Sequence, residues 1–584
     1  MFYTDYTPLL AGPKYTHWHL LLIGLCCALG CPRLSAETPG TARASSNANP
    51  QFRMPKAGRP GQMLKKDAAE VALGERLFLE TRFAQYFFEH CHGNVNAVLT
   101  TGDPVLTKSE SIDQPLPGPF AGFSINCRSC HLVREQFALG RGARAYADFA
   151  RRSPIPARGD GKKVTARNSP AMVNTSINRE GEKFFHYDAE FGTGSDLVKA
   201  TLTGRNFGWL TAERNQAVRH ISRVIREDDG RGTLAREFGG YSYGTVFAGT
   251  DSKLDEDSVL PEEYRIDVAK ATDLQVLAAV AKALEAYMDS LYFSRDETVQ
   301  YDGSPYDSFL KKNDLPRKED DGQSLLYYSR NLLSLATRLR EPRFVSPADN
   351  CFKLIKQDFR FGARELEGLK IFFGRPAASK EMRRSGIGNC VACHAPPNFT
   401  DFAFHNTGAS QEEYDTVHGA GAFAKLPIPG LKERNSSFER YLPGTVNHPN
   451  ASGRFLDIPT ADRVGHVDLG VWNVFENPEQ PLVQSALRRT LDPDGKFNPG
   501  EILERSIAAF KTPGLRGLAM SHPYLHNGSK DKIEDVIRFY IKISRLARAG
   551  ELRNGDPELA KIFLTEEDID PLAAFLRSLN EDYE

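Results

Sequence analysis

Two five-residue stretches decide the fold of this chain: Cys127-Arg-Ser-Cys-His131 and Cys390-Val-Ala-Cys-His394. Both have the form C-x-x-C-H, the spacing at which two thiols add to the two vinyl groups of haem while the adjacent imidazole ligates its iron. The alternatives for a lone C-x-x-C are a zinc site and a redox disulfide, and neither needs the following histidine. The sequence therefore predicts two covalently bound haem c groups, with His131 and His394 as iron ligands.

The chain has nine cysteines, and the attachment motifs use four of them, with Cys130 and Cys393 as the second thiol of each motif. Three others lie in the first 36 residues, which leaves Cys91 and Cys351. In an oxidising compartment these two could form a disulfide that links the halves of the chain. The alternative is that they are separate buried thiols, and the sequence leaves both open.

An apolar run from Trp18 to Cys31 follows a weakly basic start and precedes small residues suited to cleavage after Ala36. This pattern is typical of a secretory signal peptide, here residues 1–36. The run is shorter than the roughly 20 residues that a membrane-spanning helix needs, so we expect no transmembrane anchor. The alternatives are a buried N-terminal helix and a lipoprotein with its lipid at Cys31. We therefore expect a periplasmic protein, with residues 37–61 as a flexible linker.

The composition is that of a globular protein with enough mass for several cores: 584 residues, 40% hydrophobic and 26% charged. Lys and Arg number 74 and Asp and Glu 75, so the formal net charge is −1. A chain without excess positive charge has no field that would hold a polyanion over its surface. Nucleic acid is therefore not an expected partner.

The two attachment motifs have matching surroundings, which indicates an internal duplication. Residues 74–78 (Gly-Glu-Arg-Leu-Phe) precede the first motif, and residues 368–373 (Gly-Leu-Lys-Ile-Phe-Phe) precede the second. Each half then ends in a segment with apolar residues at helical spacing, Asp273–Leu291 and Ile569–Leu579. This order of helix, C-x-x-C-H, loops and closing helix is that of a c-type cytochrome domain.

We therefore predict a mainly α fold of two c-type cytochrome domains with long loops and insertions. The first haem domain covers residues 62–300 and the second covers 350–584. Residues 301–349 between them are predicted to be an insertion or linker with one helix around Leu325–Arg340. Long loops such as His418–Thr460 would help to cover the haem faces.

Three further blocks accompany the motifs. They are Arg167-Asn-Ser-Pro170 with Asn174, then Phe399-Thr-Asp-Phe402 with Phe404-His-Asn406, and then Phe510-Lys-Thr-Pro-Gly-Leu-Arg516 followed by Pro523-Tyr-Leu-His526-Asn-Gly528. Together with both motifs they resemble the bacterial dihaem cytochrome c peroxidase family, including its MauG-like branch. The resemblance implies a peroxidatic N-terminal haem, where hydrogen peroxide is reduced, and a C-terminal electron-transfer haem that passes or stores oxidising equivalents.

The resemblance also implies a calcium ion and a protein partner. The positions that match the calcium ligands are the side chain of Asn168 and the backbone oxygens of Ser521 and Pro523, which are hard ligands. The alternative for Asn168 is a turn residue beside Pro170. The partner would be an electron-donor protein, either a small cytochrome c or a cupredoxin, or else a protein substrate.

Peroxide cleavage needs a vacant or displaceable site on the iron opposite the proximal histidine. In many family members a histidine between the first motif and the R-N-S-P block caps the resting haem. Residues 132–166 contain no His and no Met, so we expect a first haem that is held by His131 alone on the protein side. Tyr146 is a candidate cap, and the alternative is an amphipathic surface helix around Ala143–Arg151.

In this chain, some of the residues that the family carries near the first haem and between the two haems are replaced by others. The glutamate that moves protons in the family aligns with Glu213, and the alternative is an ordinary glutamate at a helix N-terminus. The nearby glutamine of the family aligns with Ala200. Where the family carries a tryptophan between the haems, residues 185–190 read Phe-His-Tyr-Asp-Ala-Glu. Tyr187 or His186 would then occupy the bridging place, unless it is a packed core aromatic.

The second iron is expected to be closed on both sides, with His394 as the proximal ligand. At the place of the usual axial methionine the chain has Tyr540, whose anionic oxygen would stabilise ferric and higher states. The alternative is that Tyr540 only shares the buried face of its helix. Met520, His522 and His526 are competing ligands from the same segment.

The sequence thus predicts a periplasmic dihaem enzyme that reduces hydrogen peroxide. Oxidation of a protein side chain, as in the MauG-like branch, is an alternative that Tyr540 and the absent capping histidine favour. The rival from another class is an electron-transfer cytochrome without catalysis, which needs two six-coordinate irons. A third is an interaction protein built on haem domains.

Overall fold

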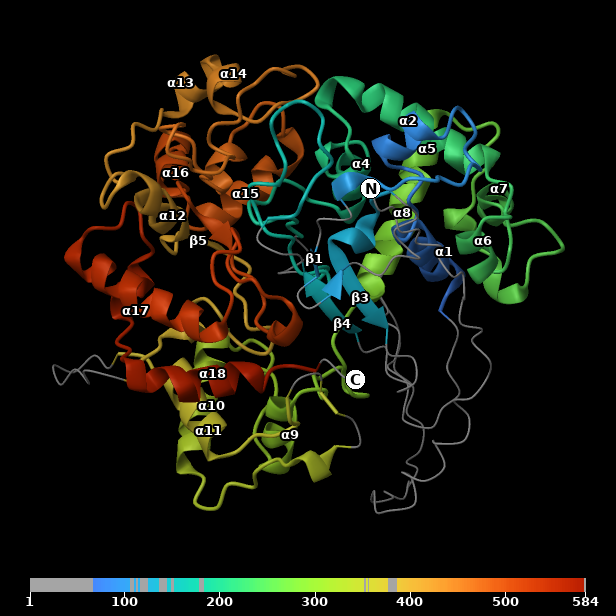
Figure 1. The fold of residues 1–584 in the computed structure, drawn as a ribbon. Coiled ribbons are helices and arrows are strands. Elements are labelled where there is room, and N and C mark those ends of the chain that lie inside the picture. Colours follow the sequence, from blue (N-terminus) through green and yellow to red (C-terminus); the bar gives the residue numbers. More distant parts are fainter. Residues whose placement is uncertain are drawn as a thin grey trace, which may run out of the picture. The chain divides into compact units, whose positions relative to one another are not determined.

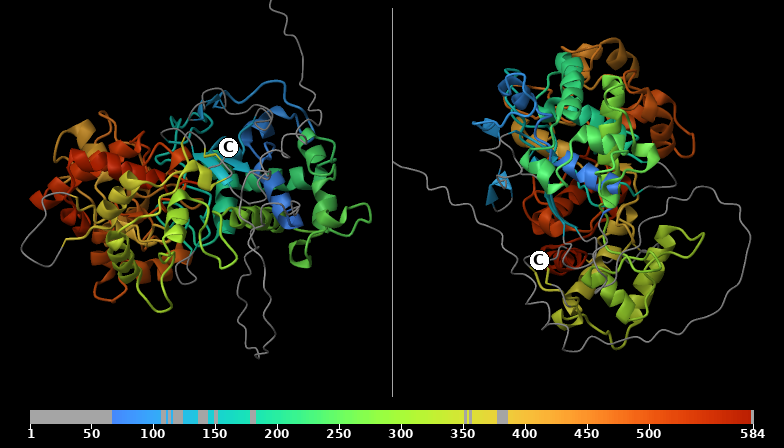
Figure 2. Two further views of the ribbon diagram at one scale, coloured as in Figure 1. Left: turned by 90° about the horizontal axis from the view of Figure 1, so that it is seen from below. Right: turned by 90° about the vertical axis from the view of Figure 1, so that its right-hand side faces the viewer.

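The computed structural model describes residues 67–105, 110–111, 114–115, 124–135, 144–148, 152–177, 183–350, 353–354, 357–376 and 386–581. The predicted signal peptide, the linker and Cys351 lie outside these residues. The chain from Lys56 to Glu584 forms one compact unit (Figures 1 and 2). Helices predominate in the part that the structure describes, so the predicted mainly α class is confirmed.

The helices of the first half surround one apolar core that runs from Leu73 to Tyr301. The longest, α8, begins with a capping box, in which the Thr272 hydroxyl accepts from the backbone N–H of Gln275. The helix predicted over Asp273–Leu291 is confirmed and ends at Ser290. The helices of this half are α1 (Ala69–Phe78), α2 (Gln85–His90), α4 (Gly194–Leu202), α5 (Arg214–Glu227), α6 (Thr233–Glu237), α7 (Tyr243–Ala248) and α8 (Asp273–Ser290).

The helices of the second half surround two further cores. One runs from Tyr306 to Leu579 and includes the helix predicted near residue 325, and the other lies mainly between Phe404 and Phe510. The segment predicted as a loop over His418–Thr460 contains two short helices. The helices are α9 (Pro305–Lys312), α10 (Leu325–Arg338), α11 (Ala363–Phe373), α12 (Ala409–His418), α13 (Leu431–Ser436), α14 (Phe438–Tyr441), α15 (Gln484–Leu491), α16 (Pro499–Arg505), α17 (Ile533–Ala549) and α18 (Ile569–Arg577).

The described strands are short and pair in antiparallel fashion. They are β1 (Glu110–Ser111) with β2 (Gln114–Pro115), β3 (His131–Glu135) with β4 (Arg144–Asp148), and β5 (Phe404–His405) with β6 (Phe510–Lys511). The surface helix predicted around Ala143–Arg151 is therefore wrong, because residues 144–148 are strand β4. The reason is that β3, which begins at His131, offers a full pairing partner in register, and such pairing overrides a weak local preference.

Each half repeats one helix pair, in which the helix before the attachment motif packs against the closing helix. In the first half this pair is α1 and α8, and in the second it is α11 and α18. Figures 1 and 2 show α11 and α18 side by side. At both crossings a glycine allows the close approach. A Cβ atom at Gly74 would lie under 3.0 Å from Ala283 O, and one at Gly368 under 3.0 Å from Pro571 O.

We expect Gly74→Ala and Gly368→Ala each to lower the free energy of unfolding by about 1–3 kcal/mol, because the new methyl group forces the paired helices apart. Urea unfolding followed by circular dichroism measures the change. Gly244→Ala in α7 is the matched control, since a Cβ there has only ordinary contacts and alanine is the better helix former. Equal effects at all three positions would contradict the role of the two crossings.

Candidate functional site

One cavity contains both attachment motifs. Its volume is about 1050 Å³, which exceeds the range of about 300–1,000 Å³ that is usual for a small-molecule site. Most of the lining is apolar, as a porphyrin requires. The attachment residues on its wall are Cys127, Cys130 and His131 from the first half, and Cys390, Cys393 and His394 from the second. The structure therefore brings all six predicted attachment residues to one space.

Each motif folds as a tight 3-10 turn that is held by an asparagine just before it. In the first motif, Asn126 Oδ1 accepts from the backbone N–H of Ser129 (3.0 Å), and the Ser129 hydroxyl accepts in return from Asn126 N–H (3.2 Å). In the second motif, Asn389 adopts a positive φ of 50° and its amide donates to the carboxylate of Glu558 (2.9 Å). These bonds hold the turns that present the thiols to the cavity.

The second motif fits a haem in its donor chemistry. The Nδ1–H of His394 donates to the carbonyl oxygen of Phe399 (3.0 Å), which leaves Nε2 with its lone pair for iron. Burial lowers the pKa of His394 and so favours the neutral, ligating form. Burial also raises the pKa of Cys390 to about 12, as it does for Cys127.

The first motif leads directly into a hairpin. His131 is the first residue of β3 and pairs with Asp148 at the end of β4. The R-N-S-P block also lines the cavity, and the Arg167 guanidinium forms ion pairs with Asp188 (2.6 Å) and Asp468 (2.5 Å). The side chain of Tyr146, the candidate cap of the first iron, lies outside the described residues.

Glu213 is not among the residues that line the cavity. Its carboxylate accepts hydrogen bonds from the guanidinium of Arg158 (2.7 and 2.9 Å) and from the backbone N–H of Leu210 (2.8 Å). Burial alone would raise the pKa of Glu213, but Arg158 and the Leu210 N–H hold it below its usual value. This position just before α5 fits the alternative interpretation, which is an ordinary glutamate at a helix N-terminus. The role of Glu213 in proton transfer stays a prediction.

Tyr187 lies on the cavity wall in the loop that replaces the family's tryptophan segment. Its ring is 6.5 Å from the ring of His526, and its carbonyl oxygen accepts from the backbone N–H of Lys511 (2.7 Å). The same loop holds a carboxylate that the sequence argument missed. Glu190 lines the cavity and its Oε2 lies 2.9 Å from Nδ1 of His186. In the sequence, the H-x-x-x-E spacing of His186 and Glu190 within residues 185–190 could have indicated this pair.

Tyr540 of α17 also lines the cavity. Burial raises the pKa of its phenol, and the nearby thiols of Cys393 and Cys390 raise it further. The predicted ligand therefore lies near both attachment thiols of the second motif, and iron ligation stays a prediction. The side chain of Met520 lies outside the described residues. His526 lines the cavity too, stacked on Phe510 at 3.6 Å.

Two of the three predicted calcium ligands are in contact, namely Asn168 from the first half of the chain and Pro523 from the second. The Asn168 side-chain amide donates to the carbonyl oxygen of Pro523, and Asn168 N–H donates to the carbonyl oxygen of His526 (2.6 Å). Ser521 lines the same cavity. The Asn168 side-chain oxygen itself accepts from the backbone N–H of Ser169 (3.0 Å), so the oxygens of Asn168 and Pro523 are both engaged in hydrogen bonds here. The calcium ion stays a prediction.

Cys91 is a buried thiol rather than half of a disulfide. It is 3% exposed and packs with Phe87 and Leu99 in a small apolar cluster. Of the two alternatives for this cysteine, the structure therefore shows the separate buried thiol.

Among the described residues, every helix is too short or too polar to cross a membrane.

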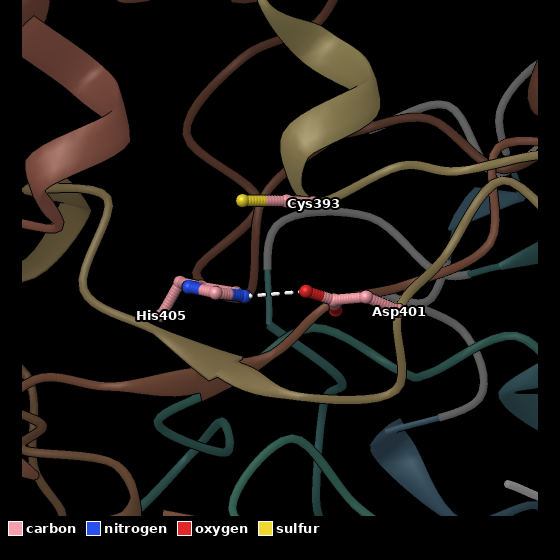
Figure 3. A group of neighbouring side chains, drawn as sticks. All are labelled: Cys393, Asp401 and His405. Atoms are coloured by element: carbon pink, nitrogen blue, oxygen red, sulfur yellow. Dashed lines mark hydrogen bonds and ion pairs between the residues drawn. The ribbon is translucent and has the colours of Figure 1, made fainter. Parts of the chain in front are cut away.

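A second group that sequence reasoning missed surrounds His405 of β5. Its Nδ1 lies 2.6 Å from Asp556 Oδ2, and its Nε2 lies 2.8 Å from Asp401 Oδ2. Figure 3 shows the imidazole directed at Asp401, with the sulfur of Cys393 close to both. Burial alone would lower the pKa of His405, but hydrogen bonds with Asp401 and Asp556, together with the Cys393 sulfur, raise it to about 12. Asp556 is far from His405 in sequence, so no local signal joins them.

No model of a known protein family matches the chain. Cytochrome-c peroxidase IdrP1 of Denitromonas iodatirespirans is 25% identical over 213 residues, which are 35% of this chain and 42% of that protein. IdrP1 of a Pseudomonas species (strain SCT) is 22% identical over 266 residues, 45% of this chain and 50% of that protein. The chain thus spans about half the length of these two curated relatives.

Methylamine utilization protein MauG of Methylorubrum extorquens is 36% identical over 89 residues, 15% of this chain and 23% of that protein. Among solved structures, a MauG-like protein associated with microbial copper homeostasis is 16% identical with a TM-score of 0.41, over 91% of this chain and 96% of that chain. The diheme peroxidase BthA of Burkholderia thailandensis is 15% identical with a TM-score of 0.37, over 89% of this chain and 87% of that chain. By sequence, the chain is therefore similar to cytochrome-c peroxidase IdrP1 and, over a shorter stretch, to MauG.

Proposed function

We propose that the chain is a periplasmic dihaem c-type peroxidase. Hydrogen peroxide would be reduced at the haem held by His131, and the haem held by His394 would pass or store the oxidising equivalents. The observation that carries this proposal is the single cavity that both C-x-x-C-H motifs line, since two haems bound there would lie close enough to exchange electrons. The named relatives support the same activity.

Cysteine thiols 127, 130, 390 and 393 would hold the two haems covalently, and the two motif histidines would ligate the irons. When bound, the haem supplies the redox chemistry of peroxide cleavage. The chain must then supply proton transfer at the cavity. We assign this role to Glu190, whose carboxylate lines the cavity with His186 as its hydrogen-bonded partner (2.9 Å). Glu213, bound to Arg158, would instead hold the start of α5.

Tyr187 would bridge the two haem sites, because its ring lies on the wall that both motifs share. Tyr540 would be a second protein ligand of the haem that His394 holds. Asn168, with the backbone oxygens of Ser521 and Pro523, would hold calcium where the two halves meet. An exported chain would receive electrons from a small cytochrome c or a cupredoxin.

A second candidate function is oxidation of a protein side chain, as in MauG. The observation that favours it is that Tyr540 lines the cavity together with the second motif, because an anionic oxygen ligand would stabilise oxidised iron. In this case a partner protein, rather than a small donor, would consume the oxidising equivalents.

Addition of hydrogen peroxide to the purified ferric protein tests the proposal. We expect one high-spin and one low-spin haem by electron paramagnetic resonance, and a rapid change in the visible spectrum on mixing. Turnover with a reduced small cytochrome c would favour the peroxidase, and slow turnover with a persistent oxidised spectrum would favour oxidation of a protein. Two low-spin haems and an unchanged spectrum would leave the electron-transfer cytochrome as the better account.

A further inference from the structure

We propose that Asp401, His405 and Asp556 form a fixed charge cluster beside the second attachment motif, in which the imidazolium of His405 raises the reduction potential of the haem bound there. His405 is thus a positioning residue for electron transfer. The inference requires haem at Cys390 and Cys393, and it does not require the reaction with peroxide.

The geometry determines the protonation of His405. Its two ring nitrogens lie 2.6 Å from Asp556 Oδ2 and 2.8 Å from Asp401 Oδ2. Ionised carboxylates only accept hydrogen bonds, so each ring nitrogen must donate one. An imidazole that donates from both nitrogens is an imidazolium, and such charge-assisted bonds are stronger than neutral ones. The cluster therefore carries one positive and two negative charges.

Backbone contacts hold each of the three cluster residues in place. His405 lies in β5 and pairs with Phe510 of β6. Asp401 Oδ1 accepts from the N–H of Ala403 (2.9 Å), and Asp556 Oδ1 accepts from the N–H of Glu558 (2.8 Å). The three cluster side chains are each about a quarter exposed or less. Because these groups are already ordered and mostly screened from water, their charges act at a fixed place.

The cluster adjoins the second haem site. The Cys393 sulfur, an Asp401 oxygen and a His405 ring nitrogen lie within 4.8 Å of one another (Figure 3). His405 and Asp556 also line the cavity that contains His394. By donor type the first three groups could hold a metal ion. However, both nitrogens of His405 face carboxylates, and Cys393 is the attachment thiol, so the geometry favours a charge cluster.

The sign of the effect follows from charge. A positive charge near a haem favours the reduced iron, which carries one positive charge fewer, and a negative charge favours the oxidised iron. The cluster has a net charge of −1 in the wild type, −2 in His405→Gln and zero in Asp556→Asn. The double variant returns to −1. The reduction potential of the second haem should follow this order.

Spectroscopic redox titration of the holoprotein, without peroxide, tests the inference. We expect His405→Gln to lower the potential of the second haem and Asp556→Asn to raise it, each by about tenfold in the equilibrium constant for reduction, or about 59 mV for one electron. The double variant should lie near the wild type. The potential of the other haem should change less.

His448→Gln is the matched control, because His448 also lies between two carboxylates, Glu439 (3.7 Å) and Glu479 (4.0 Å), but is not on the cavity wall. It should leave both potentials unchanged. If the His405→Gln variant does not incorporate haem, the test rests on Asp556→Asn, in which the reduction potential of the second haem should rise. Shifts of the same sign in the two single variants, or none in Asp556→Asn, would overturn the inference. Failure of the peroxide test would leave this result unaffected, since no peroxide is used.

Discussion

Arg516→Met should lower the free energy of unfolding by about 3–5 kcal/mol, because it leaves a buried carboxylate without its counter-charge. Arg516 donates to both oxygens of Asp307 (2.9 Å each), and both side chains are 2% exposed. The same guanidinium donates to the carbonyl oxygen of Pro397 (3.0 Å) and lies 3.8 Å from the ring centroid of Tyr301. It therefore ties α9 to the loop that follows the second attachment motif. Urea unfolding followed by circular dichroism measures the loss.

Arg343→Met is the control for this prediction, since it makes the same substitution in an exposed pair. Arg343 and Asp314 lie 2.6 Å apart but are 58% and 86% exposed, and such pairs contribute about 0–1 kcal/mol. The double variant Arg516→Met/Asp307→Asn should recover part of the loss, because no unpaired charge remains buried. A loss below about 1 kcal/mol in Arg516→Met would show that the buried pair is not a main source of stability.

The double variant Cys127→Ala/Cys130→Ala should lose the first haem and, with it, the spectral response to hydrogen peroxide. The pyridine haemochrome assay should give one haem per chain instead of two. Peroxidase turnover should fall by at least about 10³-fold, because no protein side chain supplies the redox chemistry of the cofactor. Circular dichroism checks that the fold is retained. If the variant does not fold, His131→Gly, which keeps both thiols, gives the same optical test.

Cys390→Ala/Cys393→Ala is the matched variant in the other half. It should also lose turnover, because electrons no longer reach the first haem, but it should keep the spectral response to peroxide. The two double variants thus separate the peroxidatic site from the electron-transfer site. A response that survives in Cys127→Ala/Cys130→Ala and disappears in Cys390→Ala/Cys393→Ala would reverse the assignment of the two haems.

Local patterns were sufficient for much of the helical fold. The periodic apolar residues of α8 and α18 predicted both closing helices, since a helix that buries one face repeats that face every three to four residues. The strand β4 was missed because its partner β3 decides its conformation. Short strands of this kind depend on pairing, and pairing is not visible in a single segment.

The sequence by itself predicts covalent haem attachment, because the thiols and the imidazole at C-x-x-C-H spacing are adjacent in the chain and need no distant partner. Only the tertiary structure decided which polar groups face the cavity. It places Glu190 on the cavity wall, whereas Glu213 pairs with Arg158 and does not line the cavity. It also brings Asp556 to His405 from 151 residues along the chain. Such contacts arise from the packing of whole helices and loops, which no spacing of neighbouring residues encodes.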